Sequence, residues 1–196
     1  LSSNELGSIC IKLPLPPSCL PTLWNADDRF VEAYLSKFPG YYETGDAGFM
    51  DDDGYIFVMS RTDDVINTAG HRLSTGAMEE VISNHPDVAE CAVVGARDDL
   101  KGEVPIGLAC LNTGCNREHD KICKEIVDLI RNEIGPVASF KKVAIVQTLP
   151  KTRSGKILRK TIRSIINKET WSMPPTVENP DVFQDCKKAL SKFKII

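Results

Sequence analysis

Strand patterns alternate with helix patterns through the second half of this chain, and this alternation limits the possible folds more than any other feature. Short apolar runs favour strands, whereas apolar residues three and four positions apart favour helices. We expect strands at 65–67, 71–74, 89–96, 106–111 and 142–147, and helices at 118–134, at 157–167 and after Thr75 as a cap. Because such elements bury their apolar faces against one another, the pattern predicts an α+β unit in which helices flank a short sheet.

The two ends of the chain carry different patterns. The first part combines a strand near 7–15, a proline-rich segment, a helix near 27–38 and a hairpin turn at Asp53-Gly54 before a strand at 55–60. Past residue 172, three prolines and the lack of a clear period predict a tail that is either wrapped on the surface or disordered. We therefore divide the sequence into 1–62, 63–172 and 173–196.

Charge and hydropathy exclude several classes of partner. With 24 basic and 27 acidic residues, the net charge of -3 gives no global field that would recruit nucleic acid or an anionic membrane. No apolar run approaches the roughly 20 residues that cross a bilayer. We expect a soluble protein with no nucleic-acid partner and no membrane span, in which any anion site is local.

Cysteine and histidine provide no catalytic or metal pattern. The seven cysteines are an odd number without a CxxC pair, which favours a reducing compartment, and we assign none of them to catalysis. Cys91 and Cys110 lie in apolar runs, as is typical of small core residues. His71 has no second histidine or cysteine at ligand spacing, so we expect a structural histidine there and no metal site.

The segment Pro-Lys-Thr-Arg-Ser-Gly-Lys at 150–156 joins an expected strand to an expected helix. Gly155 allows close approach of the backbone to a ligand, and Lys156 offers a mobile point charge that suits a transferring phosphoryl group. A Walker P-loop is excluded because Pro150 stands where it requires Gly and Ile157 stands where it requires Ser or Thr.

The same segment has a plainer interpretation. Seven basic residues and no acidic residue fall between 151 and 168, with Arg159, Lys160 and Arg163 expected at exposed positions of the helix. Such a run is also typical of the solvated, basic start of a helix.

A second motif, Tyr-Glu-Thr-Gly-Asp, ends at Asp46. A carboxylate held after a tight glycine turn can accept both hydroxyls of a ribose, and the alternative is a capping role. An EF-hand is excluded because Phe49 occupies its first ligand position and Ser60 its twelfth.

A third segment, from Arg61 to Arg72, is dense in charge where the first two parts of the chain meet. Taken alone, it would be a salt-bridged linker. Together and in this order, the three segments resemble the adenylate-forming superfamily, which includes acyl-CoA synthetases, luciferases and the adenylation domains of peptide synthetases.

The resemblance implies roles for individual residues. Asp46 and Arg61 match the pair that holds the ribose of ATP and AMP, and Asp63 matches the hinge on which a small C-terminal domain swivels. Arg72 matches an arginine that approaches the phosphate. Lys156 matches the lysine that orients the carboxylate and the α-phosphate during adenylation.

Finer features narrow the resemblance to the short-chain acetyl- and propionyl-CoA synthetases over roughly residues 5 to 168. These features are Arg29 to Tyr34, Gly-His-Arg-Leu-Ser-Thr-Gly, Asn132 to Pro136 and Leu-Pro-Lys-Thr-Arg-Ser-Gly-Lys-Ile-Leu-Arg-Lys. By this resemblance Ala69 and Gly70 border the path of the CoA pantetheine, and Arg131 meets the CoA nucleotide. Ala69 stands where the family often has serine, so only a backbone contact is expected there.

The implied reaction has two steps and needs no enzyme nucleophile. A short-chain carboxylate attacks the α-phosphate of ATP bound with Mg²⁺ and releases pyrophosphate, after which the CoA thiol attacks the acyl-adenylate and releases AMP. The phosphate loop and the acyl pocket of the family have no match here. We therefore expect the C-terminal part of a fatty-acid-metabolising ligase, preceded by a large N-terminal domain and inactive alone.

Two alternatives differ from this interpretation. The chain could be a non-catalytic fragment that binds only nucleotide or a partner, or part of an adenylation domain that loads a carrier protein. The proline-rich segment and the Asn-Glu-Ile-Gly-Pro run favour CoA as the acceptor. The propionate-type resemblance predicts the mitochondrial matrix, with the cytoplasm as the alternative.

Overall fold

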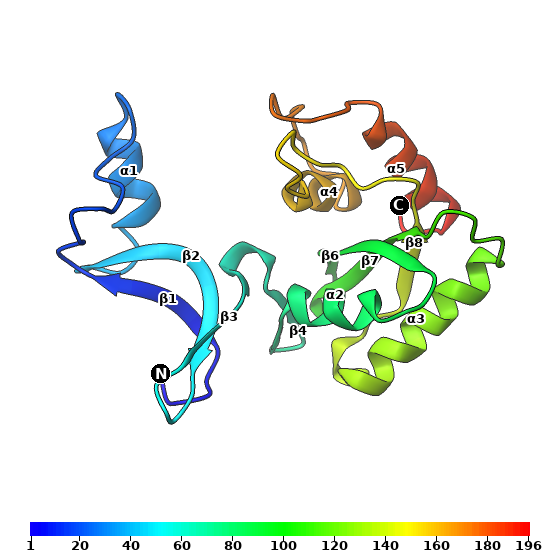
Figure 1. Ribbon diagram of the computed structural model, residues 1–196, viewed down its shortest axis with the longest axis horizontal. Helices are drawn as coiled ribbons and strands as arrows, with labels where there is room; N and C mark the ends of the chain where they lie inside the picture. The colour runs from blue at the N-terminus through cyan, green and yellow to red at the C-terminus, as the bar shows by residue number, and fades with distance from the viewer. The chain divides into compact units, whose positions relative to one another are not determined.

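The computed structural model describes residues 1–196, which form two compact units, Leu1–Val65 and Ile66–Ile196. Figure 1 shows the first unit in blue and cyan and the second in green to red. None of the helices has the length and apolar character that crossing a bilayer requires.

The first unit is a three-stranded antiparallel sheet with one helix. Strand β1 (Gly7–Lys12) pairs with β2 (Tyr41–Met50), which in turn pairs with β3 (Ile56–Arg61). The turn between β2 and β3 is closed by Asp51, whose Oδ1 accepts the backbone N–H groups of Asp53 and Tyr55. The hairpin predicted at Asp53-Gly54 is therefore present, and it uses the acidic run as turn residues.

Helix α1 (Asp27–Tyr34) packs on this sheet through aromatic rings. Phe30 is its buried residue, and the rings of Tyr34 and Tyr42 stack with centroids 5.2 Å apart. The helix was predicted to extend to residue 38 but ends at Tyr34.

The second unit is built on a five-stranded sheet. The long strand β7 (Gly102–Leu111) lies antiparallel to β6 (Val88–Asp98) on one side and parallel to β8 (Lys142–Ile145) on the other. A short hairpin, β4 (Ile66–Thr68) with β5 (His71–Leu73), joins the end of β7 through the pair Thr68 and Gly102.

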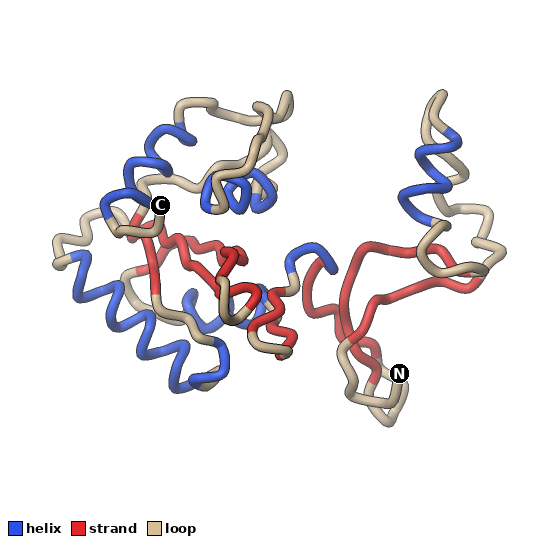
Figure 2. Tube along the Cα trace, turned by 180° about the vertical axis from the view of Figure 1, so that it is seen from behind, coloured by secondary structure: helices blue, strands red, loops and turns tan.

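Both faces of this sheet are covered by helices. Alternate residues of a strand point to opposite faces, and β6 follows this rule: Ala92 and Val94 belong to one buried cluster, whereas Cys91 and Val93 belong to another. The first cluster is covered by α4 (Arg159–Ile166) and α5 (Val182–Lys192), and the second by α2 (Thr75–Ser83) and α3 (His119–Glu133). Figure 2 shows the helices on the two sides of the red strands. The predicted α+β class, with helices flanking a short sheet, is confirmed.

Residues 173–196 were predicted to form a tail that is either wrapped on the surface or disordered, but they include a helix with buried residues. Helix α5 is part of the second unit, and Phe183, Cys186 and Leu190 on its inner side are buried. The period was present in the sequence, because Val182, Cys186 and Leu190 recur every four residues. The prolines at 174, 175 and 180 break the chain before the helix rather than within it.

The start of α2 also differs from expectation. Ser74, not Thr75, is the N-cap, and its Oγ accepts the backbone N–H of Ala77 at 3.2 Å. Thr75 is instead almost fully buried. Two short 3₁₀ turns complete the fold, η1 (Thr62–Asp64) and η2 (Pro136–Ala138).

Leu190→Ala tests whether α5 is part of the core. Leu190 is fully buried, so the substitution should lower the free energy of unfolding by about 2 to 5 kcal/mol through lost burial and a residual cavity. Urea denaturation followed by Trp171 fluorescence, in a Trp24→Phe background, measures this loss. Gln184→Ala changes an exposed residue of the same helix and is the control. Equal stability of the two variants would show that α5 does not contribute to the core.

Candidate functional site

Asp46 and Arg61 are direct cross-strand partners in β2 and β3. The guanidinium of Arg61 donates from Nη1 to Asp46 Oδ1 at 3.4 Å and to the carbonyl of Thr44 at 3.3 Å, and from Nε to Asp63 Oδ1 at 3.4 Å. These contacts are long, and the side chains of Arg61 and Asp46 are 48% and 38% exposed. Because an exposed pair of this kind contributes little to stability, the geometry mainly presents a carboxylate and a guanidinium to solvent.

Gly45 is required by this arrangement. Its φ is +77°, a conformation that other residues rarely adopt. A Cβ at this position would also lie 2.5 Å from Nη2 of Arg61, so any side chain would displace the guanidinium. The glycine of the Thr-Gly-Asp motif therefore lets Arg61 lie across the strand beside Asp46.

Asp63 lies in η1, two residues before the boundary between the units at Val65 and Ile66. It is exposed, and its carboxylate accepts the Nε–H of Arg61. Asp46, Arg61 and Asp63 are thus brought together within the first unit.

Ala69 and Gly70 form the two-residue turn between β4 and β5. Both have positive φ, +49° and +85°, as a type I′ hairpin turn requires. No atom lies within 4 Å of a Cβ built at Gly70, so the glycine serves the turn conformation rather than a close packing contact. The turn is fixed at its base, where the N–H of Ala69 donates to the carbonyl of Lys101 at 2.8 Å. Arg72, two residues after the turn, is exposed on β5.

Lys101 connects this turn to the surroundings of Arg131. Its Nζ donates to Ser139 Oγ at 2.6 Å, and both residues line a surface cavity of about 280 Å³ together with Arg131 and Lys141. Lys101 and Lys141 were not singled out from the sequence. The signal was weak, because the contact of Lys101 with Ala69 joins residues 32 positions apart in the chain.

Lys156 lies at the exposed end of a small hairpin. Thr152 donates its N–H to the carbonyl of Lys156 at 2.8 Å, and its Oγ1 accepts the N–H of Lys156 at 3.1 Å. Gly155 takes φ +82° in the turn, and Arg153 to Lys156 are all exposed. The ammonium of Lys156 is therefore presented to solvent from a hydrogen-bonded hairpin.

Known proteins resemble this chain in sequence and in structure. Residues 77–156 match the family described as AMP-binding enzyme C-terminal domain. Over this range the sequence is that of an AMP-binding enzyme C-terminal domain. The resemblance drawn from the sequence is confirmed to this extent, and Lys156 is the last residue of the matched range.

Two curated relatives cover nearly the whole chain. The mouse protein named acyl-CoA synthetase short-chain family member 3, mitochondrial, is 48% identical over 192 residues, which are 98% of this chain and 28% of the mouse protein. The propionate–CoA ligase of Escherichia coli is 42% identical over 96% of this chain and 31% of its own length. The chain thus spans about three tenths of the length of these relatives.

Solved structures agree with the sequence relatives. The o-succinylbenzoate CoA synthetase of Bacillus subtilis, solved with an acyl-adenylate intermediate, has a TM-score of 0.69 and 27% identity over 83% of this chain and 31% of its own. The amide bond synthetase of Marinactinospora thermotolerans has a TM-score of 0.71 and 25% identity over 85% of this chain and 32% of its own.

Two arginines of the second unit hold its layers together. Arg159 makes a two-pronged contact with Glu79, at 3.1 and 2.7 Å, and Arg163 contacts Glu103. Both arginines were expected at exposed helix positions, but they are part-buried, with 24% of the Arg159 side chain and 39% of the Arg163 side chain exposed. Lys160 is exposed, as expected.

Two buried cysteines of the second unit, Cys110 and Cys186, are poor nucleophiles. Burial raises the pKa of Cys110 to about 11 and that of Cys186 to about 12. These thiols are neutral near pH 7, whereas the thiolate is the reactive form. Cys91 and Cys110 are core residues, as predicted.

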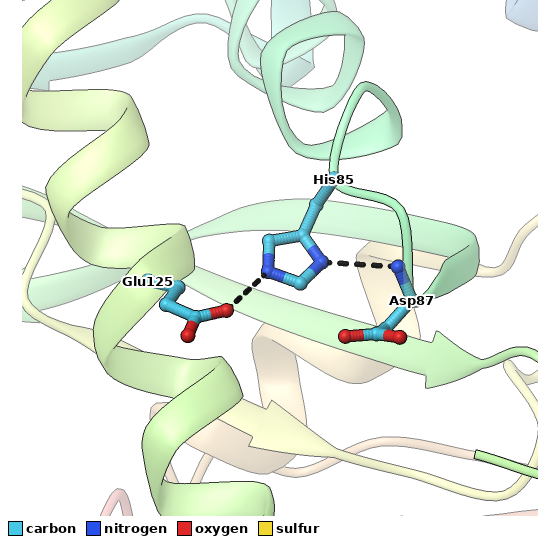
Figure 3. A group of neighbouring side chains, drawn as sticks. All are labelled: His85, Asp87 and Glu125. Atoms are coloured by element: carbon cyan, nitrogen blue, oxygen red, sulfur yellow. Dashed lines mark hydrogen bonds and ion pairs between the residues drawn. The ribbon is translucent and has the colours of Figure 1, made fainter. Parts of the chain in front are cut away.

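His85, Asp87 and Glu125 are the residues whose ligand atoms come close enough to suggest a metal site (Figure 3). Their hydrogen bonds instead indicate a structural cluster, here called the clip, which joins neighbouring segments and also includes Arg117. His85 Nδ1 accepts the N–H of Asp87, which leaves the ring proton on Nε2, and that nitrogen contacts Glu125 at 3.1 Å. Arg117 pairs with both carboxylates. The group ties the segment after α2 to α3 and to the loop before it.

Arg117→Gln tests this clip through its pH dependence. The hydrogen bond from Arg117, and next that from His85, hold the pKa of Glu125 below its ordinary value. A lowered folded-state pKa stabilises the fold above the unfolded pKa of about 4.3, and this stabilisation is lost as pH falls through the folded pKa. The variant should raise the pKa of Glu125, be less stable near pH 7 and lose less stability in acid.

Carbon-detected NMR titration of the Glu125 carboxyl, with urea midpoints across pH, measures both effects. Lys121→Gln, on an exposed position of α3, is the control. An unchanged titration of Glu125 in Arg117→Gln would contradict the assignment of Arg117 as the main cause.

Proposed function

We propose that this chain is the carboxyl-terminal part of an ATP-dependent, AMP-forming short-chain acyl-CoA synthetase. The observation that carries the proposal is the match of 98% of the chain, at 48% identity, to a protein named acyl-CoA synthetase short-chain family member 3. The positions of four charged residues support it: Arg61, Arg72 and Lys156 are exposed, and the half-buried Asp46 has 38% of its side chain exposed beside Arg61.

In the first half-reaction, an oxygen of the substrate carboxylate attacks the α-phosphorus of ATP, and the bond to the leaving pyrophosphate breaks. The ammonium of Lys156 orients the carboxylate and stabilises the negative charge that develops on the α-phosphate. Positioning and charge stabilisation are sufficient for this chemistry, so the chain needs no nucleophile of its own.

Asp46 and Arg61 bind the ribose of the nucleotide in this proposal. The Asp46 carboxylate accepts hydrogen bonds from the ribose hydroxyls. The guanidinium of Arg61 makes only long contacts within the protein, at 3.3 and 3.4 Å from Nη1, and donates hydrogen bonds to the ribose. Arg72 approaches the phosphate. Mg²⁺ binds as part of the ATP substrate in this proposal. The carboxylates of Asp87 and Glu125 are already paired with Arg117, so they are not proposed as its ligands.

In the second half-reaction, the CoA sulfur attacks the acyl carbonyl carbon and AMP leaves. Asp63 is the pivot on which the C-terminal domain turns between the two steps. Ala69 and Gly70 border the pantetheine, to which their turn offers backbone groups, and Arg131 meets the CoA nucleotide at the cavity that Lys101 and Lys141 also line.

The first unit supports the presence of a larger partner domain. Three successive residues of β3, Ile56, Phe57 and Val58, are exposed, although they are large and apolar. Successive residues of a strand point to opposite faces, so both faces of β3 expose large apolar side chains, as is typical of a surface that another domain covers. An N-terminal domain of the same protein, carrying the phosphate loop and the acyl pocket, is the proposed cover.

Propionate or acetate is the proposed acid. The bacterial relative is named for propionate, and the mouse relative for short chains. The name of the mouse protein includes the word mitochondrial, which supports the mitochondrial matrix as the proposed compartment. The cytoplasm is the alternative, given the bacterial relative.

Lys156→Ala in the whole protein separates the two half-reactions. Adenylation, measured as ATP–pyrophosphate exchange with propionate, should fall about 100- to 1000-fold because one preorganised positive charge is lost. Thioester formation from supplied propionyl-adenylate and CoA should continue. Lys160→Ala removes an exposed lysine four residues away and is the control. Normal adenylation in Lys156→Ala, or loss of thioester formation alone, would defeat the proposed role. No exchange by the wild-type protein with any short carboxylate would defeat the proposed function.

Asp46→Asn and Arg61→Gln in the whole protein should each weaken ATP and AMP binding. Each variant loses charge-assisted hydrogen bonds to the ribose, worth about 1.5 to 3 kcal/mol. Isothermal calorimetry with AMP measures the change, and Asp52→Asn in the exposed turn after β2 is the control. Wild-type affinity in both variants would show that the ribose is held elsewhere.

A further inference from the structure

The hairpin that carries Lys156 has a third strand, which comes from the far end of the chain. Lys151 and Ile157 form an antiparallel bridge within the hairpin, and Thr152 forms a second antiparallel bridge with Val177. The N–H of Arg153 donates to the carbonyl of Thr176, and the N–H of Glu178 donates to the carbonyl of Lys151, both at 3.0 Å. Residues 176–178 therefore close the outer edge of the hairpin.

This third strand is anchored, whereas the hairpin end is not. Val177 is 7% exposed and belongs to the buried cluster beneath α4 and α5. The N–H of Val177 also closes a turn onto the carbonyl of Pro174 at 3.1 Å. In contrast, Arg153 to Lys156 are exposed and have no side chain in a core cluster.

We propose that residues 176–178 are a positioning element for Lys156, which holds the lysine hairpin in the form that serves adenylation. The inference rests on the proposed function of Lys156. The bonds of Thr152 to Lys156 set the turn, and the bonds to Thr176 and Glu178 fix the strand from which that turn projects. Residues 176–178 lie outside the range 77–156 that matches the family, whereas Lys156 lies within it. The proposed positioning element is therefore not part of the matched range.

The position of a reacting group governs the rate steeply, since a displacement of about 1 Å can cost about 100-fold. A loosened hairpin should therefore slow the step that uses Lys156 and spare the step that does not. A general loss of folding would slow both steps together. This difference separates positioning from mere stabilisation of the fold.

The test uses the whole protein with Glu178→Pro, which removes the N–H that bonds to Lys151 and changes an exposed residue. Adenylation should fall about 10- to 100-fold, with thioester formation from supplied acyl-adenylate unchanged. Glu178→Ala keeps the N–H and should keep adenylation. Ser172→Pro places a proline at an exposed loop position outside these bonds and is the control.

Unchanged adenylation in a folded Glu178→Pro protein would overturn the proposal, and so would an equal fall of both half-reactions. Amide hydrogen exchange of the wild-type protein gives a test without any variant or activity. The N–H groups of Arg153 and Glu178 should both be protected from hydrogen exchange. Rapid exchange of the Arg153 N–H would show that residues 176–178 do not hold the hairpin. If the wild type shows no ATP–pyrophosphate exchange, the proposed function fails. The amide hydrogen exchange of Arg153 and Glu178 would then still decide whether residues 176–178 hold the hairpin.

Discussion

The pairing of β6 with β7 is the interaction on which the second unit depends. The two strands pair from Val88 with Leu111 to Asp98 with Gly102, and both of their faces are buried. Each face recruits its own pair of helices, so one ladder of backbone hydrogen bonds organises three layers. Gly107 of β7 leaves room for the ring of Phe140, because a Cβ there would lie 2.7 Å from Cζ. The layers also place the β4–β5 turn and the lysine hairpin on elements that the sheet holds in position.

Local patterns predicted most of this fold, and contacts between distant residues account for what they missed. The strand and helix periods of the second unit were visible because each depends on neighbours within a few positions. The burial of Arg159 was not visible, because its partner Glu79 lies 80 residues away. The sequence shows Arg159 only as one member of a basic run. Helix α5 was missed because three prolines outweighed a clear four-residue period that follows them.

The candidate site was predicted to a similar extent. The family resemblance implied that Asp46 and Arg61 act as a pair, and the two residues are cross-strand partners. Their ribose-binding role stays a prediction. Lys101 was missed because its contacts are with residues far along the chain: its carbonyl accepts the N–H of Ala69, and its ammonium donates to Ser139. Neither contact can be recognised from the residues that neighbour Lys101 in the sequence.

Helix α5 is the last helix along this sequence, and it covers one face of the central sheet. During synthesis, β6, β7 and β8 leave the ribosome before α5, because β8 ends at Ile145 and α5 begins at Val182. Ala92, Leu108 and Ala144 are fully buried in the finished unit. Until the helix emerges, the nascent chain therefore exposes part of an apolar surface that a chaperone would bind. A stop codon near residue 172 would make that exposure permanent, even though the sequence of the matched family domain would remain intact.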